Sequence, residues 1–330
     1  LGAKMTLRPY QQQAHDAAIA WMRQSVDRFC IEAATGAGKS HIIAAIAETI
    51  HSRTGKRVLC LAPSGELVTQ NRAKYLATGN KASTFSASAG AKELRHPVVF
   101  GTPLTVKNRI SRFGNQFGLI VVDECHGMTP TVRGIIDAMR TANPNVRVCG
   151  LTATPYRLGT GYIFREWPGQ DGARPRVNGE DKARKPYFAK MVCRVPAHEL
   201  LAAGYLTPPV IGAIGAGGYD TANLQPNRMG KFDKAAVDQA YHGHGRKTSA
   251  IVADIVAQAR DRRGVLIFAA TVQHAEEVLA SLPPELSAIV TATTKAKDRK
   301  EILRRFLAQE IKYLVNVAVL TTGFDAPHVD

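Results

Sequence analysis

The distribution of apolar residues divides the chain into three stretches. From residue 6 to about 155, short apolar runs alternate with segments whose apolar residues recur at helical spacing, as between Ser40 and Ile50. This alternation predicts a parallel sheet covered by helices on both faces. The strands predicted here are Phe29–Ala33, Val58–Ala62, Val98–Phe100, Leu119–Val122 and Val146–Gly150.

Composition changes between about 156 and 245, where 13 of the 28 glycines and seven of the 17 prolines fall. This content predicts a linker with an accessory insertion. Helix and strand signals then return at Ser249–Arg260, Val265–Ala269 and Tyr313–Ala318. We therefore predict an α/β fold with a first lobe at 6–155, a linker and insertion at 156–245, and a second lobe at 246–330.

A glycine-rich loop lies between the first predicted strand and the helix that follows it. It reads Ala33-Ala34-Thr35-Gly36-Ala37-Gly38-Lys39-Ser40, with alanine where the common P-loop pattern begins with glycine. Glycines let backbone N–H groups turn towards phosphates, and the helix N-terminus adds partial positive charge. We predict that Lys39 reaches the β- and γ-phosphates of ATP and that Ser40 binds Mg²⁺. The alternative is a strand–helix turn with a solvated lysine.

An acidic motif, Asp123-Glu124-Cys125-His126, directly follows the apolar run Leu119–Val122. A strand that ends there delivers its carboxylates to the edge of a parallel sheet where α/β folds bind ligands. We predict that Asp123 holds Mg²⁺ and that Glu124 orients and deprotonates the attacking water. The alternative is a surface Asp-Glu pair that caps a helix.

These two motifs, together with Thr152-Ala153-Thr154-Pro155, resemble superfamily-two helicases and translocases. Further motifs match in the expected order: Leu7–Gln11 the Q motif, Leu61–Ser64 motif Ia, Phe100–Pro103 motif Ib, Val265–Thr271 motif IV and Val319–Pro327 motif V. The strings LRPYQQ, VVDECH, GLTATPYRLG and GYLTPP are particularly similar to the bacterial RadD (YejH) helicase-like DNA repair proteins. The resemblance implies two RecA-like lobes, the second of them incomplete.

The resemblance also implies further site residues. The residues that it adds to the nucleotide site are Arg8, Gln11, Thr35, Gly36, Gly38, Gly323 and Asp325. It assigns coupling to His126, Thr152 and Thr154, with His126 also counted among the catalytic residues. The residues expected on the nucleic-acid backbone are Ser64, Gly101, Thr102 and Thr322. Simpler alternatives are that Gln11 is a solvated helix residue and that Thr152 caps a strand end.

The chain departs from the family pattern after motif V. No Q-x-x-G-R-x-x-R motif VI precedes Asp330, and the cysteine-rich zinc-binding tail of RadD-like proteins does not occur. Because the arginines of motif VI contribute ~10³–10⁵ in rate in motors that use an arginine finger, we expect this sequence to be a fragment with little hydrolytic activity of its own.

The net charge of +16, from 43 Lys plus Arg against 27 Asp plus Glu, favours a polyanionic partner. Basic residues between Arg157 and Arg194 are interleaved with aromatic ones, as in proteins that bind single-stranded nucleic acid. The alternative is an insertion whose aromatics pack locally. A second basic run, Lys295–Arg305, predicts an amphipathic helix with Ile302, Leu303, Phe306 and Leu307 on its apolar face.

Five scattered cysteines, without a C-x-x-C pair, and the lack of a long apolar run predict a cytoplasmic protein. Taken together, the sequence predicts an ATP- and Mg²⁺-dependent DNA helicase or translocase in DNA repair, acting on single strands or junctions. A single-strand-binding protein is a possible partner from the resemblance. The alternatives are an RNA helicase and a nucleotide-gated DNA-binding scaffold that does not translocate.

Overall fold

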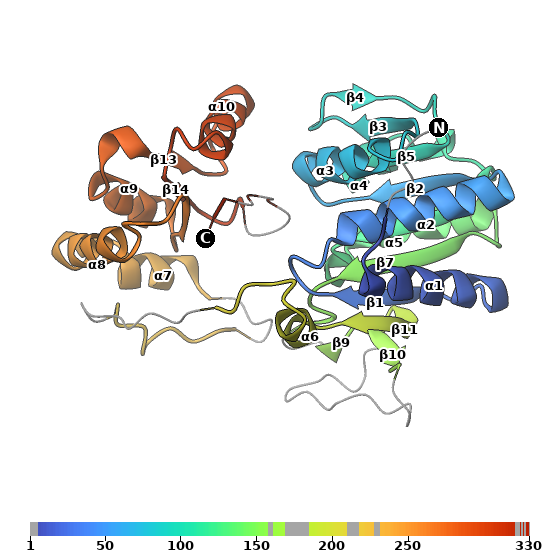
Figure 1. Cartoon of the computed structure of the whole chain (residues 1–330), viewed down its shortest axis with the longest axis horizontal. Coiled ribbons are helices and arrows are strands. Elements are labelled where there is room, and N and C mark those ends of the chain that lie inside the picture. Colours follow the sequence, from blue (N-terminus) through green and yellow to red (C-terminus); the bar gives the residue numbers. More distant parts are fainter. Residues whose placement is uncertain are drawn as a thin grey trace. The chain divides into compact units, whose positions relative to one another are not determined.

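The computed structural model describes residues 6–157, 161–168, 185–209, 218–227, 232–320, 324, 326, 328 and 329. The chain divides into two compact units, Leu1–Pro209 and Val210–Asp330 (Figure 1). Each unit has a sheet with parallel strands and helices packed around it, so the predicted α/β class is confirmed for both.

The described part of unit 1 contains a nine-stranded sheet with the strand order β10-β11-β1-β7-β6-β2-β5-β3-β4. Neighbouring strands are parallel except for the pair β3 and β4. The strands are β1 (Phe29–Ala33), β2 (Arg57–Leu61), β3 (Ala82–Ser86), β4 (Ala91–Lys92), β5 (Val98–Gly101), β6 (Phe117–Asp123), β7 (Arg147–Thr152), β10 (Phe164–Glu166) and β11 (Phe188–Val195). All five predicted strands are confirmed, each within two residues of its predicted ends.

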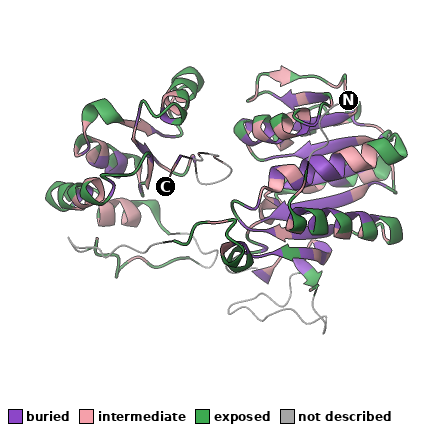
Figure 2. Ribbon diagram, viewed as in Figure 1, coloured by how far each residue is buried: buried purple, intermediate pink, exposed green. Residues whose placement is uncertain are grey.

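Helices cover both faces of this sheet. They are α1 (Pro9–Gln24), α2 (Lys39–Thr54), α3 (Gly65–Leu76), α4 (Pro103–Lys107), α5 (Pro130–Ala142) and α6 (Ala197–Ala202), with the 3-10 turns η1 (Ile110–Arg112) and η2 (Cys125–Gly127). One apolar core lies between the sheet and α1, α2 and α3, and a second lies between the sheet and α4 and α5. Figure 2 shows the buried strands between the more exposed helices.

The two cores explain the continuous apolar run of β6. Leu119 and Val121 belong to the core under α1–α3, whereas Ile120 and Val122 belong to the core under α4 and α5. Successive side chains of a strand point to opposite faces, so a strand that is covered on both faces must be apolar at every position. This packing holds Asp123 at the carboxyl end of a rigid, buried strand.

Unit 1 extends well beyond the predicted boundary at residue 155. Strand β11 pairs in parallel with β1, so that Phe29 lies opposite Lys190, and β10 pairs with β11. Phe164 and Phe188 are fully buried, so these two aromatic residues are core side chains and cannot stack on a nucleic acid. The segment predicted as an insertion therefore contributes edge strands to the first sheet, because its apolar residues complete the core beside β1.

A small antiparallel hairpin precedes these edge strands. It is formed by β8 (Tyr156–Arg157) and β9 (Gly161–Tyr162) and is separate from the main sheet. It follows directly after the Thr-Ala-Thr-Pro motif, so it places its residues near the carboxyl end of β7.

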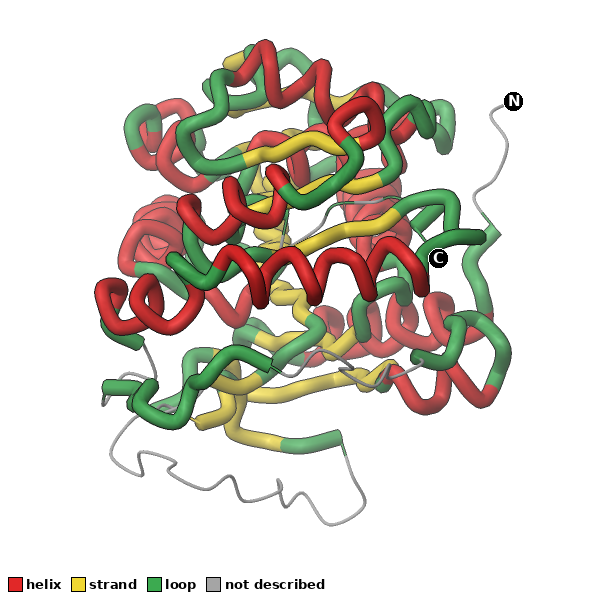
Figure 3. The backbone as a smooth tube through the Cα atoms, turned by 90° about the vertical axis from the view of Figure 1, so that its left-hand side faces the viewer, coloured by secondary structure: helices red, strands yellow, loops and turns green. Residues whose placement is uncertain are grey.

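Unit 2 contains a parallel sheet with the order β12-β14-β13 and helices around it (Figure 3). Its elements are α7 (Lys234–Tyr241), α8 (Gly245–Gln258), β12 (Val265–Phe268), α9 (Val272–Ala280), η3 (Pro284–Leu286), β13 (Ser287–Val290), α10 (Ala296–Leu307) and β14 (Tyr313–Asn316). The predicted helix and both predicted strands are confirmed. The unit begins before residue 246, because Thr271 Oγ1 donates a 2.8 Å hydrogen bond to Asp238 Oδ1 of α7.

The basic run that predicted an amphipathic helix forms α10, with Phe306 fully buried against the sheet. Leu307 was predicted on the same apolar face but is 46% exposed. It is the last residue of the helix. Arg304 pairs with Glu301 and Glu310, so part of the positive charge of this helix is neutralised within unit 2.

Candidate nucleotide-binding and coupling site

The glycine-rich loop connects β1 to α2 with the geometry that its sequence predicts. Gly36 and Gly38 have φ angles of 82° and 76°, in the left-handed region that glycine adopts without strain. Gly38 is the N-cap of α2, and Lys39 and Ser40 are the first residues of that helix. The loop and the helix N-terminus therefore present backbone N–H groups and the Lys39 ammonium at the carboxyl end of β1.

Gln11 is buried and bridges α1 to this loop. Its Nε2 donates to the Ala37 carbonyl at 2.9 Å, and its Oε1 accepts from the backbone N–H of Arg8 at 3.0 Å. A side chain on Gly38 would place its Cβ 2.6 Å from Gln11 Nε2, so only glycine fits there. Gln11 is 5% exposed, which excludes the alternative of a solvated helix residue.

Tyr205 and Leu206, for which no role was predicted, lie against the same site. The Arg8 guanidinium is 4.9 Å from the Tyr205 ring centroid, and the Tyr10 ring meets Tyr205 edge to face at 5.1 Å. Leu206 Cδ2 would be 2.6 Å from a Cβ on Gly36, so it packs directly on the loop. The only sequence signal was the string GYLTPP, which carried the resemblance without indicating a contact.

The acidic motif lies two strands away from the loop. Strand β7 pairs with both β1 and β6, so the carboxyl ends of all three strands meet at one edge of the sheet. Lys39 Nζ is 3.3 Å from Glu124 Oε1, which joins the loop to the acidic motif. Glu124 has φ 49°, a strained conformation for a residue with a side chain, and the geometry of functional sites often contains such strain.

His126 connects Glu124 to the Thr-Ala-Thr motif. Its Nδ1 is 3.4 Å from Glu124 Oε2 and 2.9 Å from Thr152 Oγ1. Thr152 Oγ1 also accepts the backbone N–H of Thr154 at 3.0 Å, so this hydroxyl is both a cap and a bridge. A series of polar contacts therefore runs from Lys39 through Glu124 and His126 to Thr152.

Asn71 of α3 is a site residue that the sequence did not identify. Its side chain is 1% exposed, and its Nδ2 donates to Asp123 Oδ2 at 2.8 Å. The other carboxylate oxygen, Oδ1, accepts the backbone N–H of Glu124 at 3.0 Å. Asn71 therefore orients the carboxylate from outside the acidic motif.

The two carboxylates have different electrostatic surroundings. Burial raises the pKa of Asp123 above its ordinary value, although the hydrogen bond from Asn71 opposes this effect. Burial also acts to raise the pKa of Glu124, but His126 and the charge of Lys39 outweigh it, so this pKa lies below its ordinary value. Glu124 is therefore ionised at neutral pH beside the loop.

The residues present fit a magnesium ion. Mg²⁺ prefers oxygen ligands, and Ser40 and Asp123 supply a hydroxyl and a carboxylate. Asp123 is 5% exposed, and the hydrogen bonds described for its carboxylate come from two uncharged N–H groups. Burial of this carboxylate is costly even though the charge of Lys39 acts on it, and a cation in contact with it would reduce that cost.

The residues expected on nucleic acid lie at the ends of β2 and β5. Ser64 is the N-cap of α3, and its hydroxyl accepts the backbone N–H of Leu67 at 3.2 Å. Thr102 is 8% exposed, and its hydroxyl lies 3.1 Å from Ser86 Oγ and 3.0 Å from Thr105 Oγ1. Gly101 is buried. The nucleic-acid contacts of Ser64, Gly101 and Thr102 stay predictions.

Thr322, Gly323 and Asp325 lie outside the described residues, so their predicted roles stay predictions, as does the expectation about motif VI. All five cysteines are buried and unpaired. In the part of the chain that the structure describes, no helix is long and apolar enough to cross a bilayer.

Comparison with known families identifies the class of protein. The family model of the type III restriction enzyme res subunit matches residues 4–157, and the model of the helicase conserved C-terminal domain matches residues 247–330. Together, the two matches place the chain among the superfamily-two helicases, whose domains are those of NTP-hydrolysing enzymes. The RadD assignment is not tested and stays a prediction.

One curated relative is the DNA 3'-5' translocase XPB2 of Sulfurisphaera tokodaii, which is 26% identical over 344 residues, covering 98% of this chain and 73% of the relative. Among solved structures, Dbp5 of S. cerevisiae bound to RNA and ADP BeF3 matches with a TM-score of 0.60 and 15% identity, over 98% of this chain and 73% of that one. The DNA-bound restriction-modification enzyme LlaBIII matches with a TM-score of 0.59 and 16% identity, over 99% of this chain.

The chain spans only 25% of the length of LlaBIII. At these identities the structural matches bear on the fold, and they confirm the predicted two-lobe, RecA-like class. What the relatives bind is a property of those proteins.

Proposed function

We propose that this chain is the motor part of an ATP-dependent DNA translocase or helicase that serves DNA repair, as its resemblance to RadD-like proteins implies. The observation that carries the proposal is the series of contacts from Lys39 through Glu124 and His126 to Thr152. ATP hydrolysis changes the charge beside Glu124, and this series transmits that change to the segment that leaves β7.

In this proposal the residues of the loop and Gln11 bind ATP, and Ser40 and Asp123 hold Mg²⁺. The bound ion would neutralise charge on the phosphates. Glu124 orients and deprotonates the attacking water, while Lys39 stabilises the charge that develops on the γ-phosphate. Gly323 and Asp325 contribute to the nucleotide site, and Ser64, Gly101, Thr102 and Thr322 contact the strand.

The proposal favours DNA over RNA because the curated relative is named a DNA translocase. The net charge of +16 suits either polyanion. A single-strand-binding protein is the protein partner that the RadD resemblance suggests. A cytoplasmic location is part of the same proposal.

The test is the ATPase rate with and without single-stranded DNA, and with RNA of the same sequence. It compares the wild type with Lys39→Ala and Glu124→Gln in a full-length protein that carries motif VI. We expect DNA to stimulate the wild type and both variants to lose hydrolysis. Lys81→Ala, an exposed lysine on the same unit, is the control and should keep the wild-type rate.

Three outcomes would change the proposal. Full turnover by both variants would refute the catalytic roles. Stronger stimulation by RNA would identify an RNA helicase. ATP binding with no nucleic-acid-stimulated turnover in a full-length protein that carries motif VI would identify a nucleotide-gated scaffold that does not translocate.

A further inference from the structure

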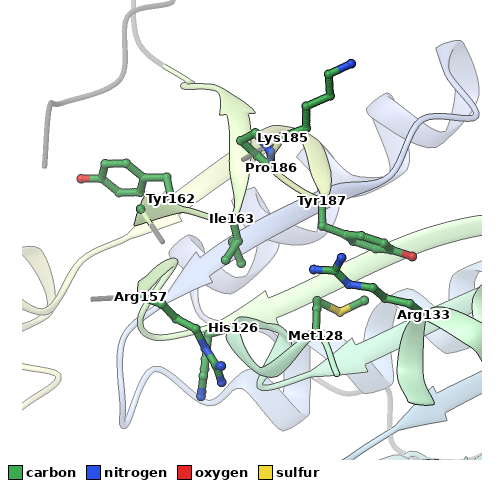
Figure 4. A pocket seen from close by; sticks show the side chains of 10 residues that line it. His126, Met128, Arg133, Arg157, Tyr162, Ile163, Lys185, Pro186 and Tyr187 are labelled. Atoms are coloured by element: carbon green, nitrogen blue, oxygen red, sulfur yellow. The ribbon is translucent and has the colours of Figure 1, made fainter. Parts of the chain in front are cut away.

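A hollow on unit 1 gathers basic and aromatic side chains beside His126 (Figure 4). Its lining comes from segments that are far apart in the sequence: the turn after β6, the first turns of α5, the β8–β9 hairpin and the residues before β11. The lining residues that matter for the argument are His126, Arg133, Arg157, Tyr162, Lys185 and Tyr187.

The hollow has an excess of positive charge. Arg133, Arg157 and Lys185 line it, and none of the described lining residues is acidic. The guanidinium groups of Arg28 and Arg133 lie 4.1 and 5.0 Å from the same Tyr187 ring centroid. The like charges of Arg133, Arg157 and Lys185 repel one another, so the lining of the hollow favours an anion that neutralises them.

Two features of Arg133 point towards such a ligand. Its Nε atom is buried and has no hydrogen-bond partner among the described residues. In Figure 4 its guanidinium group extends into the space beside Ile163 and below Tyr187. Arg133 also lies near the N-terminus of α5, where the partial positive charge of a 13-residue helix adds to that of the side chains.

The aromatic side chains favour a strand of nucleic acid over a free anion. Tyr162 lines the hollow, and its ring centroid is 6.1 Å from that of Tyr156, which is 45% exposed beside Arg157. Aromatic faces set among cations suit bases and sugars that follow a bound phosphate. A free phosphate would contact the cations and leave the aromatic surface unused.

We propose that this hollow is a phosphate-binding site for the backbone of a nucleic-acid strand. The hollow adjoins the ends of β6 and β7. It is therefore separate from the P-loop, which follows β1, and from the contacts expected at Ser64 and Thr102, which follow β2 and β5. The proposal rests on the proposed function, because it assigns a further strand contact to the same motor.

The location of the site connects strand binding to hydrolysis. His126 lines the hollow, and its Nδ1 lies within 3.4 Å of Glu124 Oε2 and 2.9 Å of Thr152 Oγ1. A phosphate held by Arg133 and Arg157 therefore lies against the residue that links the catalytic carboxylate to the Thr-Ala-Thr motif. Occupation of the hollow biases the position of His126, and nucleic acid stimulates hydrolysis by this route.

The experiment measures the affinity of a fluorescent single-stranded DNA 20-mer by anisotropy across a salt series, for the wild type and for the double variant Arg133→Gln/Arg157→Gln. For single strands each phosphate contact contributes about 0.7 to the slope of log K against log salt, so the slope should fall by about 1.4. The same relation gives a loss of affinity of about 25-fold at about 0.1 M salt.

The matched control is Arg23→Gln/Arg53→Gln, which removes the same charge from exposed positions in the last turns of α1 and α2. It should keep the wild-type slope. Thermal unfolding reports whether the double variant folds. If it does not, Lys185→Glu at the exposed rim of the hollow provides the test, and it should also weaken strand binding and lower the slope.

The assignment would be overturned if the double variant bound the strand with the same affinity and the same salt slope as the control. A second arm compares thermal stability in phosphate and in chloride at equal ionic strength. Stabilisation of the wild type but not of the variant by phosphate, with equal strand binding, would show a site for free phosphate and would also overturn it. A wild type that binds no strand at any salt concentration would instead refute the proposed function itself.

Discussion

Asn71 offers a sharp test of how the acidic motif is held in place. Its Nδ2 donates a 2.8 Å hydrogen bond to Asp123 Oδ2, and both side chains are almost completely buried, at 1% and 5% exposure. Substitution by alanine removes this donor and leaves the carboxylate with the backbone N–H of Glu124 alone. The carboxylate is then free to rotate away from the orientation in which it would meet Mg²⁺.

The magnitude follows from the kind of hydrogen bond that is lost. A hydrogen bond to a charged group contributes about 1.5–3 kcal/mol, which corresponds to about 10- to 150-fold in an equilibrium constant. Because burial raises the pKa of Asp123 and Asn71 opposes this, the variant also shifts the carboxyl group towards its neutral form. Both effects weaken Mg²⁺ binding, so we expect the Mg²⁺ requirement for binding a fluorescent ATP analogue to rise by about ten-fold or more.

The assay is a titration of Mg²⁺ against a fixed concentration of the fluorescent analogue, for the wild type and for Asn71→Ala. Thr69→Ala is the control, since Thr69 lies on the same helix and its hydroxyl donates to the Gly65 carbonyl, away from Asp123. Higher Mg²⁺ should restore binding in Asn71→Ala. A folded Asn71→Ala protein with the wild-type Mg²⁺ dependence would show that Asn71 does not position the metal ligand.

Three further predictions concern other contacts. Thr152→Val removes the hydroxyl that the Thr154 N–H and His126 share. The free energy of unfolding in urea should therefore fall by about 1–3 kcal/mol, and nucleic-acid stimulation of hydrolysis should also fall. Unchanged values of both would contradict the coupling role. Tyr205→Ala removes a ring stacked beside Arg8, so the preference for ATP over GTP should fall by about 2- to 10-fold in competition binding, and an unchanged ratio would exclude base recognition. Burial lowers the pKa of His274, whose Nδ1 accepts the Ala270 N–H, so the folded unit 2 binds fewer protons than the unfolded chain. Its stability should therefore fall as the pH drops from about 7.5 to about 5.5, and His274→Gln should flatten this dependence in urea unfolding.

The sequence alone determined the parts of the site that are local. The glycine-rich loop follows from residues that are adjacent in the chain, because Gly36 and Gly38 adopt left-handed conformations and the next residues begin a helix. The strand before Asp123 is equally readable, since a strand that is covered on both faces is apolar at every position. The strands that were predicted, and the helices predicted after Ser40, at 249–260 and at 295–305, are present because their apolar patterns are local as well.

The tertiary structure decided which distant residues join that site. Asn71 and Asp123 are 52 residues apart, and nothing in the pattern of α3 distinguishes Asn71 from a solvated amide. Tyr205 lies in a segment of glycines and prolines, and its place beside Tyr10 depends on the course of the chain after β11.

Unit 1 extends past the predicted boundary of the first lobe for a related reason. The pairing of β11 with β1 joins segments that are far apart in the sequence. It forms because Phe188 and Met191 complete the apolar core at the edge of β1. Local propensity determines whether a segment can form a strand, but its neighbour in the sheet depends on which surfaces remain to be buried. The same folding brings Arg133, Arg157 and Lys185 together around one hollow, which no spacing in the sequence predicts.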